Sequence, residues 1–89
     1  MASFEIRWKR SAVKELRNLP QPVIGKILST IETLADDPIP AAAVKLTGTK
    51  HTYRIRAGDY RLIYNVLKGV LTIEVVRVRH RKAAYRDIL

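Results

Sequence analysis

The fold of this 89-residue chain is decided by one stretch, Tyr53-Arg54-Ile55-Arg56-Ala57-Gly58-Asp59-Tyr60-Arg61-Leu62-Ile63-Tyr64. Apolar and polar side chains alternate on both sides of its central Gly58-Asp59 pair. This period of two is typical of β-strands, and the pair is typical of a two-residue hairpin turn. The sequence therefore predicts an antiparallel hairpin with strands over residues 53–57 and 60–67.

The turn also fixes which side chains face each other across the hairpin. Counting outward from it places Arg56 opposite Arg61, with Arg54 two residues away on the same face. Like charges in directly opposed positions destabilise a sheet, so a bound anion such as a phosphodiester is the expected compensation. The alternative is that carboxylates of the chain itself, with Glu74 on the same face, neutralise these arginines.

A third strand is predicted after the hairpin. Lys68-Gly69 reads as a second two-residue turn, followed by a strand over residues 70–78. Strict alternation from this turn places Leu71 on the apolar face. It also places Arg77 and Arg79 on that apolar side, close to the end of the strand.

The first half of the chain predicts one strand and two helices. Residues 4–9 alternate between apolar and polar, and Ser11 is expected to cap a first helix. Pro20 and Pro22 end that helix and suit the first turn of the second, which carries an apolar stripe over residues 23–34.

Together these elements predict one α+β domain over residues 1–89. Its expected order is an N-terminal strand, a two-helix hairpin, an antiparallel three-strand meander and a short C-terminal helix, with the helices packed on one sheet face. Trp8 is expected in the core. The chain has no cysteine, signal peptide or long apolar run, so we expect a cytoplasmic protein that does not meet a membrane.

The positive charge is concentrated in the second half of the chain. Residues 1–44 hold six bases and five acids, whereas residues 45–89 hold eleven bases, seven of them arginines, and three acids. This pattern favours a polyanionic partner, because arginine makes forked contacts with phosphate oxygens. An acidic protein partner or a merely solvated face would be the alternatives.

The sequence contains no motif for a metal site, a cofactor or a nucleophilic triad. Metal-dependent phosphodiester cleavage usually needs several carboxylates, and the basic half offers only Asp59, Glu74 and Asp87. A nuclease built from this chain would therefore need the 2′-hydroxyl of RNA as nucleophile, with arginines stabilising the charge that develops on the phosphorus.

Residues 53–64 strongly resemble the central hairpin of the RelE/ParE toxin superfamily, and Val78-Arg79-His80-Arg81-Lys82-Ala83-Ala84-Tyr85 resembles its closing motif. Ile6-Arg7-Trp8, Leu34-Ala35-Asp36-Asp37-Pro38 and Lys45-Leu46-Thr47-Gly48 resemble further segments, so the likeness covers essentially the whole chain. The resemblance implies a RelE-like fold and the toxin of a type II toxin–antitoxin system. Such a toxin is a metal-independent, ribosome-dependent endoribonuclease that cleaves messenger RNA in the ribosomal A site and inhibits translation.

The resemblance also implies roles for single residues. Arg54 and Arg56 would contact RNA, one of them assisting proton removal, and Arg61 would bind RNA and stabilise the transition state. Arg81 would stabilise the phosphate or protonate the leaving group. Tyr85 would stack on a base near the cut, unless it only anchors a terminal helix in the core.

Four further residues are candidates, two of them secondary. The secondary candidates are His80, because histidine side chains commonly transfer protons in catalysis, and Lys82, which follows Arg81 directly. Lys45 and Lys50 precede the hairpin and are expected to contact RNA.

One departure from RelE leaves alternatives open. RelE has lysines at the positions of Arg54 and Arg56, and arginine is far harder to deprotonate. Another group or water could act as the base, or the chain could be a weaker nuclease. The change favours the ParE branch, which inhibits DNA gyrase without cutting RNA, whereas Arg61, Arg81 and Tyr85 favour the RelE branch. A non-catalytic nucleic-acid-binding module is a third possibility.

The resemblance implies a RelB-like antitoxin as a partner, besides the ribosome. A basic groove suits an acidic or amphipathic antitoxin segment, laid over the helices or along a strand edge. Such a segment would either cover the arginines or displace the terminal helix.

Overall fold

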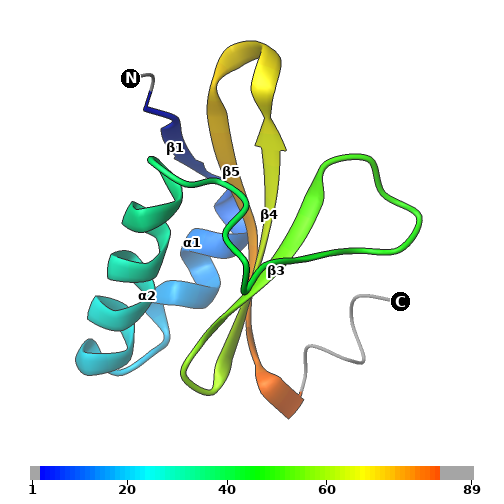
Figure 1. The fold of residues 1–89 in the computed structure, drawn as a ribbon. Helices are drawn as coiled ribbons and strands as arrows, with labels where there is room; N and C mark the ends of the chain where they lie inside the picture. The colour runs from blue at the N-terminus through cyan, green and yellow to red at the C-terminus, as the bar shows by residue number, and fades with distance from the viewer. Residues whose placement is uncertain (1–2, 83–89) are drawn as a thin grey trace.

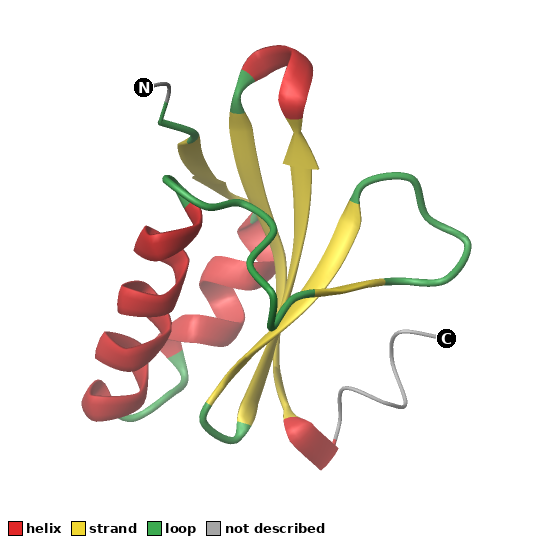
Figure 2. Ribbon diagram, in the orientation of Figure 1, coloured by secondary structure: helices red, strands yellow, loops and turns green. Residues whose placement is uncertain are grey.

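The computed structural model describes residues 3–82, which form two helices and a five-stranded sheet (Figures 1 and 2). The elements follow one another as β1 (Glu5–Trp8), α1 (Arg10–Arg17), α2 (Gln21–Leu34), β2 (Val44–Lys45), β3 (Thr52–Ala57), β4 (Tyr60–Leu67), a 3₁₀ turn η1 (Lys68–Val70) and β5 (Thr72–His80). The predicted α+β class, with its first strand, helix pair and meander, is confirmed. Of the predicted C-terminal helix, the described residues include only Arg81 and Lys82, which are helical.

The sheet is mixed, with the order β1-β5-β4-β3-β2. The strand β1 is parallel to β5, and the other neighbours are antiparallel. Both helices pack against the same sheet face, which is the face that Figure 1 shows covered by α2. The buried core joins them to the sheet through Ala12, Ile27, Ile31, Leu34, Ile55, Ala57, Leu62, Tyr64, Val66, Ile73, Val75 and Val78.

The two prolines separate the helices as predicted, but the expected cap of the first helix is wrong. Pro20 is the residue before α2, and Pro22 lies in its first turn. The helix α1 begins at Arg10, so Ser11 lies inside it and caps nothing. The Ser11 hydroxyl instead donates a hydrogen bond to the carbonyl of Val76 on β5, at 3.2 Å.

The register of the β3–β4 hairpin is confirmed pair by pair. Arg56 lies opposite Arg61, and Arg54 lies opposite Ile63. Gly58 adopts a φ of +62°, a left-handed conformation that glycine tolerates without steric cost. The three arginines of the hairpin therefore share the face that the helices leave uncovered.

The predicted turn at Lys68-Gly69 is wrong. Leu67 pairs with Thr72, so the connection between β4 and β5 extends two residues further than predicted, to Leu71, and includes η1. Type I′ turns need positive φ at both central residues, and lysine does not suit the first of them. Here the left-handed residue is Leu71, which has a φ of +46° and is 43% exposed and so not part of the core.

A β-bulge in β5 corrects a second prediction. Tyr64 pairs with Val75, but the preceding Ile63 pairs with Arg77, so Val76 is an extra residue between them. An inserted residue reverses the alternation of everything beyond it. Arg77 and Arg79 consequently lie on the uncovered face, where strict alternation had placed them on the apolar side.

The segment between α2 and β3 is held by Tyr64, whose hydroxyl donates a hydrogen bond to the carbonyl of Pro38 at 2.8 Å. Burial raises the pKa of this phenol above its ordinary value. The strand β2 was not predicted, because two residues are too few to show a period. No helix within residues 3–82 has the length and apolar character needed to span a bilayer.

Candidate nucleic-acid interface

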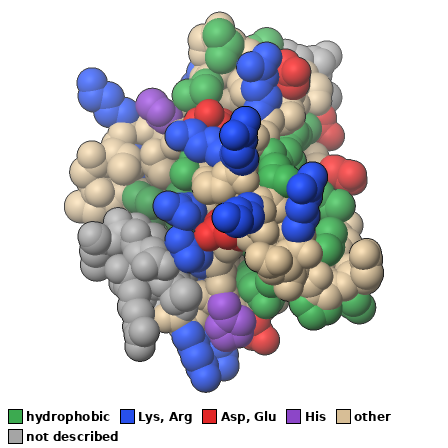
Figure 3. Space-filling view, turned by 180° about the vertical axis from the view of Figure 1, so that it is seen from behind, with side chains coloured by type: hydrophobic (Ala, Val, Ile, Leu, Met, Phe, Trp, Pro, Cys, Tyr) green, Lys and Arg blue, Asp and Glu red, His purple; other side chains and the backbone are tan. Residues whose placement is uncertain are grey.

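Three arginines lie next to one another across three strands of the uncovered face. Arg56 on β3 is directly opposite Arg61 on β4, and Arg61 is directly opposite Arg79 on β5. Side chains in opposed positions lie on the same side of a sheet. We call Arg56, Arg61 and Arg79 the arginine row, and Figure 3 shows Lys and Arg side chains gathered in the middle of the molecule seen from behind.

Arg61 is the buried member of the arginine row. It is only 6% exposed, and its Nη1 atom is buried without a hydrogen-bond partner among the described residues. A buried polar group that makes no hydrogen bond costs free energy, and a charged group costs more. Its position thus lowers the stability of the chain alone and favours an anion that could accept the missing bond.

A pocket of about 300 Å³ gives an anion access to these arginines. It is lined by Arg54, Arg56 and Arg61, together with Ala42 and Val44. The sequence-predicted trio of the hairpin is therefore brought together around one cavity. Three guanidinium groups around such a cavity suit a phosphate, which can accept a forked pair of hydrogen bonds from each.

Glu74, which lies on the same face as the row, is engaged elsewhere. Glu74 accepts a hydrogen bond from the Asn65 amide at 2.9 Å, in a chain that continues to Thr52. Within residues 3–82, neither Arg56 nor Arg61 has a carboxylate at ion-pair distance. Among the described residues, Glu74 therefore does not neutralise Arg56 or Arg61.

The residues after β5 lie at the turn end of the hairpin. His80 pairs with Tyr60, and the two rings make an edge-to-face contact at 5.3 Å. The backbone N–H of Arg81 donates to the Asp59 carbonyl at 2.7 Å, which leaves the Arg81 side chain exposed beside the turn. Lys82 is also exposed, and its N–H donates to Nδ1 of His80 at 3.3 Å.

Lys45 is not brought to the row. Lys45 pairs with Tyr53, whereas its neighbour Val44 pairs with Arg54, so Lys45 lies on the opposite face from the arginines. Lys50 is exposed in the loop before β3. Tyr85 lies outside the described residues.

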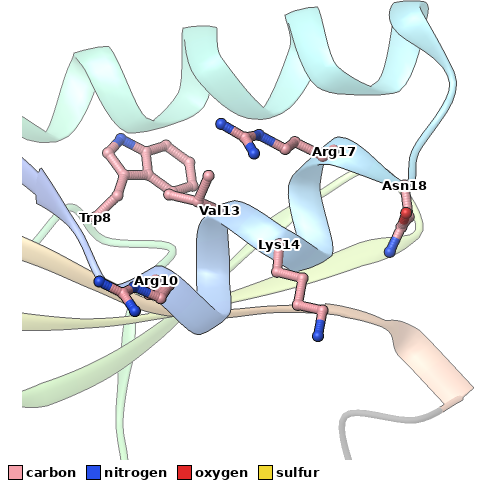
Figure 4. A pocket seen from close by; sticks show the side chains of 6 residues that line it. All are labelled: Trp8, Arg10, Val13, Lys14, Arg17 and Asn18. Carbon is pink, nitrogen blue, oxygen red and sulfur yellow. The ribbon is translucent and has the colours of Figure 1, made fainter.

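A second hollow, of about 900 Å³, lies along α1 (Figure 4). Trp8 is half-buried at the edge of the core, not within it, and lines this hollow beside Val13. Its other lining residues are Arg10, Lys14, Arg17 and Asn18. An apolar floor with cations around it is a surface that suits an acidic amphipathic segment.

Two residues of the site were missed by the sequence reasoning. Arg79 was assigned to the wrong face, because nothing in the local sequence marks the bulge at Val76. Glu15 was not singled out in the sequence, although its carboxylate lies 3.0 Å from Nε of Arg79. Among the described residues, no three potential metal-ligating side chains lie together.

Comparisons with known proteins agree on one family. Residues 6–85 match the family model of the ParE toxin of type II toxin–antitoxin systems. The chain is 31% identical over 87 residues to the putative toxin RelE1 of Methanocaldococcus jannaschii, covering 94% of this chain and 97% of that protein. It is 33% identical over 82 residues to a putative RelE-like toxin protein of Escherichia coli, covering 89% and 84%.

Solved structures give the same answer for the fold. The RelE–RelB complex of Pyrococcus horikoshii superposes with a TM-score of 0.79 at 30% identity, covering 89% of this chain and 96% of that one. The intact RelBE toxin–antitoxin complex of Escherichia coli gives 0.78 at 26% identity, covering 88% and 96%.

Proposed function

The chain belongs to the ParE toxin family of type II toxin–antitoxin systems, within the RelE/ParE superfamily, and from this premise we propose that it is a RelE-like endoribonuclease that cleaves messenger RNA on the ribosome. The observation that carries the proposal is Arg61, which is buried between two other arginines and whose Nη1 has no hydrogen-bond partner within residues 3–82. A surface that only had to avoid aggregation would expose this charge to water. A site that receives a phosphodiester would hold it as it is held here.

The proposed cleavage of RNA uses the positive charges of arginine side chains and needs no metal ion. The 2′-hydroxyl of RNA loses its proton and attacks the adjacent phosphorus, the bond to the 5′-oxygen breaks, and that oxygen takes up a proton. The negative charge of the intermediate is greatest on the non-bridging oxygens, which the arginine row and Arg54 would stabilise through preorganised donors. Arg81 lies near the hairpin turn and is the candidate for the leaving-group side.

The group that removes the proton from the 2′-hydroxyl is not an arginine of the hairpin in its ordinary charged form. His80 is half-buried at the end of β5, and its Nδ1 accepts the Lys82 N–H. This contact occupies one ring nitrogen with the chain's own backbone. We therefore assign removal of this proton to water or to a group of the RNA or the ribosome, with His80 and Lys82 as secondary candidates for the base.

Cleavage can be tested with the full-length chain, ribosomes and a defined messenger RNA whose new 5′ ends are mapped. The wild type should cut within the A-site codon, and Arg61→Ala should cut about 10²–10³-fold more slowly, the usual cost of losing one donor to a developing oxyanion. Arg7→Ala is the matched control, since Arg7 is an exposed arginine on β1.

The same experiment separates the other possible activities. Intact messenger RNA together with DNA breaks after induction would support a ParE-like gyrase inhibitor. Intact messenger RNA with no growth defect would support a non-catalytic binding module. Cleavage that survives in Arg61→Ala and Arg81→Ala would show that the site is elsewhere.

The partner that neutralises the toxin is proposed to be a RelB-like antitoxin, and the hollow along α1 is the surface that best suits it. Arg10, Lys14 and Arg17 place three positive charges around the apolar floor made by Trp8 and Val13. Reversing all three charges to glutamate should weaken binding of the cognate antitoxin, measured by calorimetry, and leave messenger RNA cleavage unchanged. Unchanged affinity would exclude this hollow as the docking surface.

A further inference from the structure

The edge of β5 changes partner halfway along its length. β1 covers it as far as the pair of Trp8 with Val75, and the last bond of that edge runs from the Lys9 N–H to the Val75 carbonyl at 2.9 Å. Beyond this point α1 takes the place of a strand. Its Ser11 hydroxyl donates to the Val76 carbonyl, and its Glu15 carboxylate accepts the Val78 N–H at 2.9 Å.

The two oxygens of Glu15 do different things. Oε1 accepts the backbone N–H of Val78, which fixes the carboxylate against the strand. Oε2 lies 3.0 Å from Nε of Arg79 and 3.5 Å from Nη1 of Arg77. The contact with Arg79 Nε is an ion pair without hydrogen-bond geometry. The Glu15 side chain is 20% exposed, so these ion pairs are partly shielded from water.

Arg79 is the outer member of the arginine row, opposite Arg61. Without an opposing charge, repulsion from Arg61 would drive its long side chain outward. The ion pair with Glu15 counteracts this repulsion and restricts the rotamers of Arg79 before any RNA arrives. The helix α1 thereby fixes one end of a site whose other members lie on the hairpin.

We propose that Glu15 is a positioning residue of the nuclease site, which holds Arg79 at the end of the arginine row through its second carboxylate oxygen while the first anchors α1 to β5. This inference rests on the proposed function, because it assigns Glu15 a part in RNA cleavage. Glu15 itself touches no substrate. Its effect reaches the phosphate only through Arg79.

The test is Glu15→Gln in the full-length chain, because the amide oxygen can still accept the Val78 N–H while the charge is lost. The single-turnover rate of cleavage on programmed ribosomes should fall about 10–100-fold with KM changed less than about threefold, as expected for a misplaced transition-state contact. Glu32→Gln removes the same charge from an exposed site on α2 and should change neither value.

A double-mutant cycle separates positioning from a general effect on the fold. In the Arg79→Ala background, Glu15→Gln should cause no further loss of rate, because the residue through which Glu15 acts is gone. An equal loss in both backgrounds, or an unchanged rate in Glu15→Gln alone, would overturn the proposal.

A readout without catalysis keeps this inference distinct from the proposed function. The NMR order parameter of the Arg79 Nε–H bond should fall clearly in Glu15→Gln, because the ion pair no longer restricts the side chain. If the wild type cuts no RNA, the proposed function fails, and the order parameter alone then tests whether Glu15 holds Arg79. An unchanged order parameter would show that it does not.

Discussion

Replacing Arg61 with methionine should stabilise the fold while abolishing the proposed cleavage, because methionine keeps an unbranched apolar stem and removes the buried charge. The structure supplies the magnitude. The unpartnered Nη1 costs about 1–3 kcal/mol, and each of the two opposed arginine pairs costs about 0.2–1 kcal/mol. Because contributions of neighbouring groups are not additive, we expect a net gain of about 1–3 kcal/mol.

The gain is measured as the free energy of unfolding from urea titrations of the free toxin at low salt. One kcal/mol should raise the melting temperature by about 4–8 °C in a domain of this size. Arg7→Met is the control, an exposed arginine on β1 for which we expect a change within about 0.5 kcal/mol. Inorganic phosphate should stabilise the wild type and have a much smaller effect on Arg61→Met, since an anion that binds only the folded state adds to stability.

A variant less stable than the wild type would refute this reasoning. It would show that the Arg61 guanidinium is held by favourable contacts and that its burial carries no cost. The arginine row would then be a structural feature, and the main support for an anion site would be lost.

Three further predictions follow from single residues. Tyr64→Phe should remove part of the loss of stability at alkaline pH, because burial raises the pKa of this phenol in the folded state. Above about pH 10 the free energy of unfolding of the wild type should therefore fall by up to about 1.4 kcal/mol per pH unit more than that of the variant, measured by urea titration. Leu71→Gly should raise the free energy of unfolding by about 0.5 kcal/mol, because it relieves a left-handed conformation at an exposed residue; a loss in the same titration would contradict this. Arg56→Ala should lower the slope of log affinity for single-stranded RNA against log salt by about 0.7, seen by fluorescence anisotropy, and an unchanged slope would exclude a phosphate contact.

The hairpin was predictable because its register depends on one turn. Gly58-Asp59 fixes every pair out to Arg54 and Ile63, and no irregularity intervenes before them. Alternation was then enough to bring Arg54, Arg56 and Arg61 to one face. This part of the candidate site could therefore be worked out from the sequence alone.

The third strand was not predictable in the same way, because two non-local features override its alternation. The turn through Leu71 moves the register by two residues, which preserves the faces, and the bulge at Val76 moves it by one, which reverses them. The face on which Arg79 lies could therefore be learned only from the structure. The role of Glu15 also could not be read from the sequence, since its contacts with β5 join residues more than sixty positions apart.

The pairing of β1 with β5 has a consequence for the order of folding. Ile6 and Ile73 are partners, so nearly the whole chain must close into a loop before this pair can form. The β3–β4 hairpin needs only local closure and can assemble early. We therefore expect the pair of Arg56 and Arg61 to form before Glu15 of α1 meets Arg79, so that the site is complete only at the last step of folding.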